Sequence, residues 1–311
     1  MLQINVDVSI IIVNYNTKDL TLDCIRSIIE YTKGIKYEII VVDNASSDES
    51  VNFIMDYYPN INIIKSENNI GFGRANNLGS KSAKGKYLFF LNSDCLLIEN
   101  AIKNMFDYFE SNNSNINRLG AVGCSLLDKN YNPNLSYNYF PTPANQIKSN
   151  IAGLLEKILK KNNFRMKGGA NYKLNKDGEV EYINGADLFV PRNVFNQLNG
   201  FDSSFFMYYE ETDLQKRMSE KSLKRVILSN VRILHFGGGS TPKKLSSKTI
   251  YIDSNLKYMR KHYSLVVYAI YYIIKLILFI PILFNCKHSR KDKKEFLKMV
   301  IRNGIPCLKV N

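Results

Sequence analysis

The sequence is poor in cysteine and histidine, and neither residue type forms a pattern typical of a stabilising site. Its five cysteines are scattered, no two form a C-x-x-C pair, and the three histidines do not stand at zinc-site spacing. We therefore exclude a disulfide framework and a structural zinc site. The cysteines are interpreted as reduced, mostly buried thiols of a cytosolic protein: Cys24, Cys95, Cys124, Cys286 and Cys307.

A secretion signal is also missing from the first residues. The segment MLQINVDVSIIIVNYN has no basic start followed by a long apolar run and a small-residue cleavage site. We therefore expect the protein to act in the cytoplasm.

Acidic residues are too few to balance the lysines and arginines, but the imbalance is local. The chain has 42 Lys and Arg against 28 Asp and Glu, which gives a net charge of +14. From Ser240 to Asn311 the net charge is +12, so the first 239 residues carry only +2. Because the excess charge is confined to the C-terminal tail, a nucleic-acid partner is not expected.

The same tail contains an apolar run from Leu265 to Phe284 with a single charge at Lys275. About 20 apolar residues would just cross a bilayer. However, Lys275 and Pro281 interrupt the run, and basic residues flank it on both sides, so there is no positive-inside asymmetry. We favour a helix or helix pair lying in the cytoplasmic leaflet, with lysines and arginines on anionic head groups. A spanning helix and an ordinary buried helix are the alternatives.

The first hundred residues alternate short Val- and Ile-rich runs with amphipathic segments. This alternation predicts βαβ units, and therefore an α/β fold with a mainly parallel sheet covered by helices on both faces. Ligands of such sheets lie outside the carboxyl ends of the strands. The polar residues that follow the four runs are Asn14, Tyr15 and Asn16; Asp43 and Asn44; Glu67, Asn68 and Asn69; and Asn92, Ser93 and Asp94.

A length of 311 residues suits one large α/β domain with an appendage, or two modest domains. The regular pattern dissolves at residues 128–181, apart from one amphipathic run near Ile147 to Leu159, and it resumes at VEYINGADLFV. We predict a domain at residues 1–240, in which 128–181 is a variable excursion on the acceptor side. Residues 241–311 are predicted to form a helical, basic and apolar region.

Two segments could bind a nucleotide. In VVDNASSDES, Asp43 stands at a strand tip, where it can accept hydrogen bonds from a ribose or a base, and Ser46 and Glu49 have capping-box spacing. In NNIGFGRANNLG, the glycines suit a tight entry into a helix whose first amides approach a phosphate, and Arg74 adds a bidentate cation. The third glycine of a dinucleotide fingerprint is missing, which excludes a Rossmann dehydrogenase.

Two strand ends could share a divalent cation. Asn92 and Asp94 in FLNSDC offer oxygen ligands of the kind that Mg²⁺ and Mn²⁺ prefer. His235 in ILHFGGGS ends another predicted strand, and three glycines follow it. A shared metal on Asp94 and His235 is one interpretation, and a purely structural role for His235 is the other.

The segment FMYYEETDLQKR places three carboxylates within four positions. On a helix, Glu210, Asp213 and Arg217 share one face, whereas Glu211 points about 100° away. We expect Arg217 to neutralise Glu210 and Asp213, which leaves Glu211 as an unpaired carboxylate of raised pKa, suited to act as a general base. The alternative is an ordinary helix start whose acids favour the positive end of the helix dipole.

Seven segments together resemble the inverting glycosyltransferases of family 2, which have the GT-A fold. They occur in the order of that family and cover about three quarters of the chain, from Val8 to about Ser240. Within the family, the sequence is most similar to bacterial rhamnosyltransferase-type enzymes of cell-surface polysaccharide synthesis. The segments are VSIIIVNYN, VVDNASSD, NIGFGRANN, FLNSD, INGADLFVPR, GFDSSFFMYYEETDLQKR and LHFGGGS.

The resemblance implies how the donor is bound. Asp43 would contact the base or ribose, Arg74 would lie beside the base or diphosphate, and Asn14 would belong to the same nucleotide-sugar site. Asp94 would be the metal-binding member of the D-x-D element of the family. Asn92 replaces its first acid, which weakens the expected metal site.

The resemblance also assigns the chemistry. His235 would be a second metal ligand, and Glu211 would be the catalytic base, standing where the family has Asp, with Glu210, Asp213 and Arg217 in support. The implied reaction moves a sugar, with rhamnose as one candidate, from a nucleotide-diphosphate donor to a hydroxyl of a glycan or lipid-linked glycan, with inversion. The implied cofactor is Mg²⁺ or Mn²⁺.

The expected setting is the inner face of the cell membrane, where the tail would hold the enzyme peripherally on an anionic surface. A homo-oligomer is a further expectation. Two alternatives remain. A processive synthase would carry a Q-x-x-R-W element, but the chain has no tryptophan. A nucleotide-sugar-binding scaffold of an assembly complex would release no nucleoside diphosphate.

Overall fold

The computed structural model describes residues 6–112, 119–159, 176–237, 245–284 and 289–304. The chain divides into two compact units, which we call the sheet unit and the helical unit. The sheet unit comprises Met1–Phe140, Ala170–Phe206 and Glu210–Thr241, and the helical unit comprises Pro141–Gly169, Met207–Tyr209 and Pro242–Asn311. The predicted excursion at 128–181 is therefore shared between the two units.

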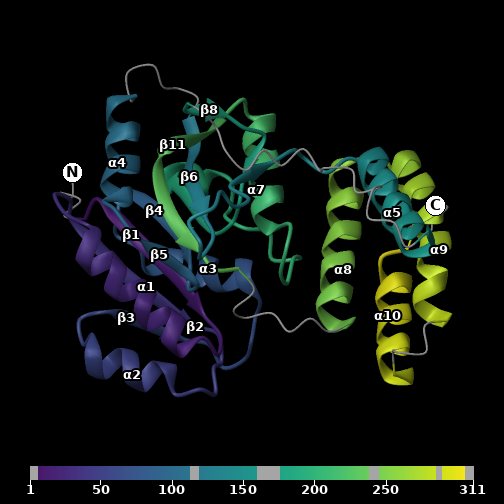
Figure 1. The fold of residues 1–311 in the computed structure, drawn as a ribbon, viewed down its shortest axis with the longest axis horizontal. Helices are drawn as coiled ribbons and strands as arrows, with labels where there is room; N and C mark the ends of the chain where they lie inside the picture. Colours follow the sequence, from purple (N-terminus) through teal and green to yellow (C-terminus); the bar gives the residue numbers. More distant parts are fainter. Residues whose placement is uncertain (1–5, 113–118, 160–175, 238–244, 285–288, 305–311) are drawn as a thin grey trace, which may run out of the picture. The chain divides into compact units, whose positions relative to one another are not determined.

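The sheet unit begins with the strand and helix alternation that the sequence predicts (Figure 1). Its strands are β1 (Val8–Asn14), β2 (Tyr37–Asp43), β3 (Asn62–Lys65), β4 (Tyr87–Asn92), β5 (Cys95–Leu97), β6 (Leu119–Leu127), β7 (Tyr137–Asn138), β8 (Gly178–Glu179), β9 (Tyr182–Ile183), β10 (Asp187–Pro191) and β11 (Lys224–His235). Its helices are α1 (Lys18–Tyr31), α2 (Ser50–Tyr57), α3 (Phe72–Ser82), α4 (Ala101–Ser111), α6 (Arg192–Gln197) and α7 (Glu210–Glu220).

The main sheet has the strand order β3-β2-β1-β4-β10-β6-β11-β5, with β8 paired to β11. Strands β1 to β4 are parallel, and β11 is parallel to β6. Between these two parallel groups runs β10, which is antiparallel to both β4 and β6. The predicted mixed α/β sheet is confirmed, and the carboxyl ends of β1, β2 and β4 lie along one edge.

Helices cover both faces of this sheet, which explains why its strands are apolar along their whole length. Alternate residues of β1 face opposite sides: Ile10 and Ile12 pack in one core, and Ile11 and Val13 pack in the other. The first core includes residues of α1, α2 and α4, and the second includes residues of α3, α6 and α7. Helices on both sides thus fix the sheet that carries the strand-end residues.

The start of α2 differs from the prediction. The capping box expected at Ser46 and Glu49 is not formed, because α2 begins at Ser50 and Glu49 has a left-handed φ of 62° without a side-chain cap. The hydroxyl of Ser46 instead accepts hydrogen bonds from the Asn14 side chain and the Asn16 amide. Asn14, which is distant in the sequence, therefore binds the hydroxyl of Ser46 that the local pattern assigned to the helix cap.

The described residues of the helical unit form helices, which Figure 1 shows grouped together. The carboxylate of Asp253 organises part of it, since it accepts hydrogen bonds from Arg302 at 2.7 Å and Asn303 at 2.8 Å and pairs with Lys257 at 2.7 Å. The helices are α5 (Pro143–Leu159), α8 (Leu245–His262), α9 (Leu265–Phe284) and α10 (Arg290–Arg302).

Helix α9 has its polar groups on the buried side and its aliphatic groups on the exposed side. The hydroxyl of Tyr272 donates to the Val300 carbonyl at 2.9 Å, and the hydroxyl of Tyr271 donates to the Asn255 side chain at 2.5 Å. Lys275 is only 4% exposed and lies over the rings of Tyr271 and Phe279. The exposed side carries Val266, Ile270, Ile273, Ile277 and Ile280.

This arrangement bears on two expectations about the tail. Lys275 does not face head groups, and its burial together with the charge of Lys248 lowers its pKa to about 8. Within the described ranges, none of the helices has the length and apolar character needed to cross a bilayer. The three described cysteines, Cys24, Cys95 and Cys124, are buried free thiols as predicted, and Cys286 and Cys307 lie outside the described residues.

The close contact between α3 and the sheet generates a stability prediction. A Cβ added at Gly79 would lie 2.7 Å from Cγ2 of Ile11 and 2.9 Å from Cγ2 of Val42. Gly79→Ala should therefore lower the free energy of unfolding by about 1–3 kcal/mol, as overpacking does. Gly153→Ala in α5 is the control, since its Cβ would meet no atom within 4 Å, and it should raise stability by up to about 1 kcal/mol. Denaturant unfolding checks both, and a shift in the same direction for both variants would contradict the packing argument.

Candidate active site

Three of the predicted site residues end neighbouring strands of the sheet. Asn14 pairs in register with Asp43, and Val13 pairs in register with Asn92. Because β1, β2 and β4 are parallel, these side chains lie along the same edge. The structure thus brings together Asn14, Asp43 and Asn92, as the sequence pattern predicted.

Asn14 has all of its side-chain groups occupied by protein partners. Its Nδ2 lies within hydrogen-bond distance of Asp43 at 2.9 Å, Ser46 at 2.9 Å and Ser50 at 2.7 Å, which share its two N–H groups. Its Oδ1 accepts from the hydroxyls of Thr17 and Thr21. Since the side chain is also 0% exposed, it cannot reach a ligand. The expected direct contact between Asn14 and the nucleotide is therefore replaced by a contact with Asp43, which Asn14 orients.

The loop after β2 is tied to the loop before α3. The side chain of Asn44 accepts from the Ile70 amide at 2.9 Å and donates to Asn69 at 3.0 Å. Asp43 itself is buried and accepts from the Ser46 amide at 3.2 Å. These bonds hold Asp43 in one orientation at the sheet edge.

The start of α3 is hydrogen-bonded to the loop that contains Phe206. The Phe72 amide donates to the Phe206 carbonyl at 2.9 Å, and a Cβ at Gly71 would lie 2.1 Å from that carbonyl oxygen. The first amide of α3 is thus bonded within the protein and is not available to a phosphate. Arg74 is exposed, and its Nε donates to the Ser203 carbonyl at 2.7 Å.

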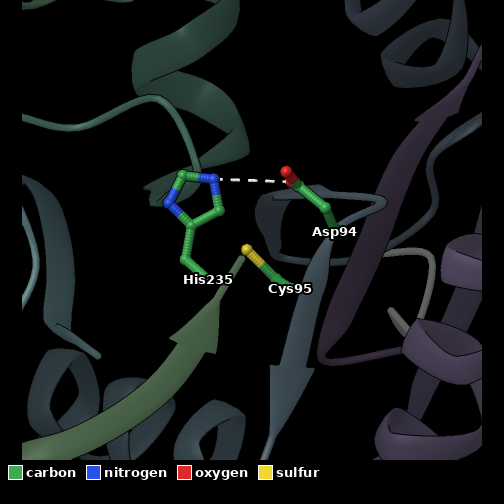
Figure 2. A group of neighbouring side chains, drawn as sticks. All are labelled: Asp94, Cys95 and His235. Carbon is green, nitrogen blue, oxygen red and sulfur yellow. Dashed lines mark ion pairs between the residues drawn. The ribbon is translucent and has the colours of Figure 1, made fainter. Parts of the chain in front are cut away.

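A second cluster forms where β5 meets β11. Figure 2 shows the imidazole of His235 turned toward the carboxylate of Asp94, with the sulfur of Cys95 beside them. Nε2 of His235 lies 3.4 Å from Oδ1 of Asp94, and the possible ligand atoms of the three residues lie within 4.8 Å of one another. This cluster brings together the two residues predicted to share a metal.

Two of these three donors suit a hard divalent cation. A carboxylate oxygen and an imidazole nitrogen are common ligands of such ions. The thiol of Cys95 is less suitable, because it donates to the Ala186 carbonyl at 3.6 Å and burial raises its pKa well above the usual range. Nearby on β4, Oδ1 of Asn92 is buried without a hydrogen-bond partner in the described part of the chain. The residues therefore fit a divalent metal.

Asp187 is a buried acid at the start of β10 that the sequence analysis did not select. Its Oδ2 accepts from the Cys124 amide at 2.6 Å, and its Oδ1 has no hydrogen-bond partner among the described residues. Burial raises its pKa to about 7, although the backbone bond and the charge of His235 oppose the shift. The sequence signal that could have identified Asp187 is a single acidic residue at the first position of an apolar strand.

The acids of α7 are arranged differently from the expectation. Arg217 bonds Asp213 at 2.9 Å and also donates to the carbonyls of Leu198 and Gly200, so the predicted i,i+4 pair is present. Glu210 is not neutralised by Arg217. Its Oε2 is buried without a partner in the described part of the chain. Two helical turns separate Glu210 from Arg217, a rise of about 10 Å, so sharing one face of the helix does not bring them into contact.

Glu211 lies against the turn before β10. A Cβ at Gly185 would lie 3.1 Å from Cγ and 3.6 Å from Cδ of Glu211. The next residue, Ala186, accepts from the Asn92 amide at 3.0 Å and from the Cys95 thiol. Gly185, which Glu211 lies against, is thus the residue before a carbonyl that contacts both Asn92 and Cys95. This contact links the carboxylate to the strand-end cluster.

The electrostatics of Glu211 favour proton transfer. The residue is partly exposed, and burial raises the pKa of its carboxyl above the ordinary value. A hydrogen bond from the Thr212 hydroxyl at 3.2 Å opposes the shift. A carboxylate with a raised pKa that is held on a helix has the properties of a general base.

Comparison with known proteins points to one family. The family model for glycosyl transferase family 2 matches residues 9–170, just over half of the chain. The low-salt glycan biosynthesis hexosyltransferase Agl10 of Haloferax volcanii is 26% identical over 257 residues, which cover 81% of this chain and 75% of that protein. The N-acetylglucosaminyl-diphospho-decaprenol L-rhamnosyltransferase of Mycobacterium tuberculosis is 25% identical over 224 residues, or 67% of this chain and 69% of that protein.

A solved structure supports the fold. The crystal structure of residues 1–349 of TarS from S. aureus superimposes with a TM-score of 0.55 and covers 96% of this chain and 71% of that one. The same fragment in complex with UDP gives a TM-score of 0.54. Sequence identity is 13% in both comparisons, so the likeness concerns the arrangement of the backbone.

Proposed function

Because the chain belongs to glycosyl transferase family 2, we propose that it transfers a sugar from a nucleotide-diphosphate donor to a hydroxyl group of a glycan, with inversion at the anomeric carbon. The GT-A fold expected from the sequence is confirmed by the sheet and by its likeness to TarS. The observation that carries the proposal is the position of Glu211 against Gly185, next to the carbonyl that contacts Asn92 and Cys95.

Glu211 is proposed as the catalytic base. It would take the proton of the acceptor hydroxyl as that oxygen attacks the anomeric carbon from the face opposite the nucleotide. A single displacement of this kind inverts the configuration. The contact with Gly185 supports this role, because a side chain there would occupy the space of the Glu211 carboxylate.

The donor is proposed to lie along the carboxyl edge of β1, β2 and β4. Asp43, oriented by Asn14, would accept hydrogen bonds from the base or ribose. Arg74 would contact the diphosphate with its two terminal nitrogens, for which the described residues provide no partner, while its Nε holds the Ser203 carbonyl. Asn92, whose Oδ1 is unpaired among the described residues, would also face the donor.

Asp94 and His235 are proposed to hold Mg²⁺ or Mn²⁺. A bound cation would supply electrostatic stabilisation of the departing diphosphate. The 3.4 Å separation of the two side chains supports their acting on one ion, and the Asn134 side chain fixes the end of β11 by donating to the His235 carbonyl at 3.2 Å.

The acceptor is proposed to be a glycan on a lipid carrier, and rhamnose is one candidate for the sugar. One relative is a rhamnosyltransferase whose name specifies a diphospho-decaprenol acceptor. The exposed aliphatic side of α9 supports peripheral binding at the inner face of the cell membrane, where such acceptors reside. Exposed basic residues of α8 and α10 would contact anionic head groups: Arg260, Lys261, Arg290, Lys291, Lys294 and Lys298.

Replacing the proposed base tests the chemistry. Glu211→Gln keeps the shape of the side chain but removes its capacity to accept a proton, so transfer should fall by at least ~100-fold. Binding of the nucleoside diphosphate, measured by calorimetry, should not change. Glu220→Gln at the exposed end of α7 is the control. Full turnover by Glu211→Gln would place the base elsewhere.

Metal binding can be measured without turnover. Mn²⁺ should raise the melting temperature of the wild-type protein, as a ligand of the folded state does. Asp94→Asn and His235→Ala should each remove most of that shift, whereas Cys95→Ser should retain it because the thiol is not a proposed ligand. An equal Mn²⁺ response in all four proteins would rule out the Asp94 and His235 site.

Membrane binding can be tested on the exposed side of α9. The double variant Ile273→Ser and Ile277→Ser removes two side chains that are 52% and 62% exposed. Each is worth about 1.5–3 kcal/mol when buried, so partitioning onto vesicles of phosphatidylcholine and phosphatidylglycerol should fall at least ~10-fold. Met55→Ser with Tyr57→Ser on α2, which are 52% and 67% exposed, is the matched control. Co-flotation that is equal for both double variants would contradict the proposed membrane surface.

A further inference from the structure

The chain between β6 and β7 turns back onto the end of β6. The Asn134 amide donates to the Leu126 carbonyl at 2.8 Å, and the Leu126 amide donates to the Ser136 hydroxyl at 2.8 Å. Both backbone groups of Leu126 are thus bonded, as they would be by a neighbouring strand. Ser136 is 2% exposed, and its hydroxyl donates in turn to the Asn134 carbonyl at 3.2 Å. We call residues 134–136 the bridging segment, and these bonds fix its place within the sheet unit.

The first residue of the bridging segment bonds the end of β11. Strand β6 ends at Leu127, which pairs with Leu234, so the parallel ladder stops one residue before His235. Nδ2 of Asn134 donates to the His235 carbonyl at 3.2 Å, and its Oδ1 accepts from the Leu135 amide at 2.8 Å. The side chain of Asn134 thus takes the place of the missing strand partner of His235.

Strand β5 bonds the other side of the same strand end. His235 pairs in register with Cys95, and the Phe236 amide donates to the Asp94 carbonyl at 3.1 Å. The backbone around His235 is therefore bonded on one side by Asn134 and on the other by β5. A side chain on a backbone fixed in this way has few directions open to it, and Figure 2 shows the imidazole turned toward Asp94.

The rest of the bridging segment bonds the turn that packs against the proposed base. The Asn184 amide donates to the Ser136 carbonyl at 2.8 Å, and Nδ2 of Asn184 donates to the Leu135 carbonyl at 3.1 Å. Oδ1 of Asn184 accepts from the Ala186 amide at 3.0 Å. Gly185, the residue in contact with the proposed base, lies between these two bonded residues. The turn is thereby attached to the bridging segment.

One short segment therefore bonds both halves of the proposed site. Its first residue bonds the strand end that carries His235, and its last two residues bond the turn against which the Glu211 carboxylate packs. We propose that Asn134 and Asn184 are positioning residues, which the bridging segment joins so that the proposed metal site and the proposed base stay at a fixed separation. Transfer needs a fixed separation, because the base and the departing diphosphate act on the same sugar.

This inference rests on the proposed roles of His235 and Glu211, and it assigns a task to part of the range 128–181, where the regular sequence pattern dissolves. A purely structural role is the competing explanation, since the same bonds would stabilise the sheet unit without any effect on a metal or on the base. The two explanations differ in whether the affinity for Mn²⁺ and the rate of transfer change when the bonds are removed.

The first test uses Asn134→Ala in the full chain. The Kd of Mn²⁺, measured from the electron paramagnetic resonance signal of the free ion, should rise at least ~10-fold, because binding the metal must then also order the released strand end. Ser136→Ala removes the hydroxyl that bonds both Leu126 and Asn134, and it should act in the same direction. It is the second variant if Asn134→Ala folds poorly.

The second test uses Asn184→Ala, which releases the turn from the bridging segment. In the transferase assay, kcat should fall about tenfold while KM for the nucleotide sugar stays within about twofold, because the surface against which Glu211 packs is then free to shift. A loss of stability alone would lower the melting temperature and leave kcat of the folded protein unchanged.

Asn112→Ala is the matched control for both tests. Nδ2 of Asn112 also donates to a backbone carbonyl, that of Tyr108 at 2.7 Å, but at the end of α4. This variant should change neither the Kd of Mn²⁺ nor kcat.

Three results would each overturn the proposal. They are an unchanged Kd of Mn²⁺ in both Asn134→Ala and Ser136→Ala, an unchanged kcat in Asn184→Ala, and effects of equal size in Asn112→Ala. Wild-type protein that binds Mn²⁺ but transfers no sugar from any donor would refute the proposed function alone, and the Kd values would still decide the role of Asn134.

Discussion

The site depends on one side chain that docks a helix onto a strand. Gln215 of α7 is fully buried, and its amide accepts from the Ile183 nitrogen at 2.7 Å and donates to the Ile183 oxygen at 2.8 Å. It thereby bonds both backbone groups of one residue, as a neighbouring strand would. With α7 fixed against β9, the residue one turn before Gln215 lies at Gly185, and that residue is Glu211. The position of the proposed base follows from a hydrogen-bond pair four residues away.

Amide side chains make similar contacts at the carboxyl edge of β1, β2 and β4. Asn14 joins the ends of β1 and β2 to the loop before α2, and Asn44 joins the end of β2 to the loop before α3. Loops lack a regular ladder, so their buried polar groups need such partners. The result is a rigid edge in which Asp43 has one orientation. Preorganisation of this kind lets a site bind charged groups without first rearranging.

The local sequence pattern predicted some structural features correctly and others wrongly. The βαβ alternation and the Asp213–Arg217 pair follow from spacing within a helix or strand, and both are present. Ser46 was assigned to a helix cap, but Asn14 of another strand binds its hydroxyl. Lys275 was identified only as a charge that interrupts an apolar run, but aromatic rings from its own helix cover it. The errors concern side chains whose partner is distant in the sequence, such as Ser46, or whose helix can bury either of two faces, such as Lys275.

The two neighbouring acids of α7 can divide their roles because they differ in burial. Glu210 is buried against Gly73, and burial together with the charge of Glu211 raises its pKa well above the usual range. Glu211 is partly exposed, and hydrogen bonds from Thr212 favour its charged form. Two carboxylates this close titrate as a pair, and burial disfavours the charged form of the more buried group more strongly. A charge on Glu211 is therefore disfavoured less than a charge on Glu210.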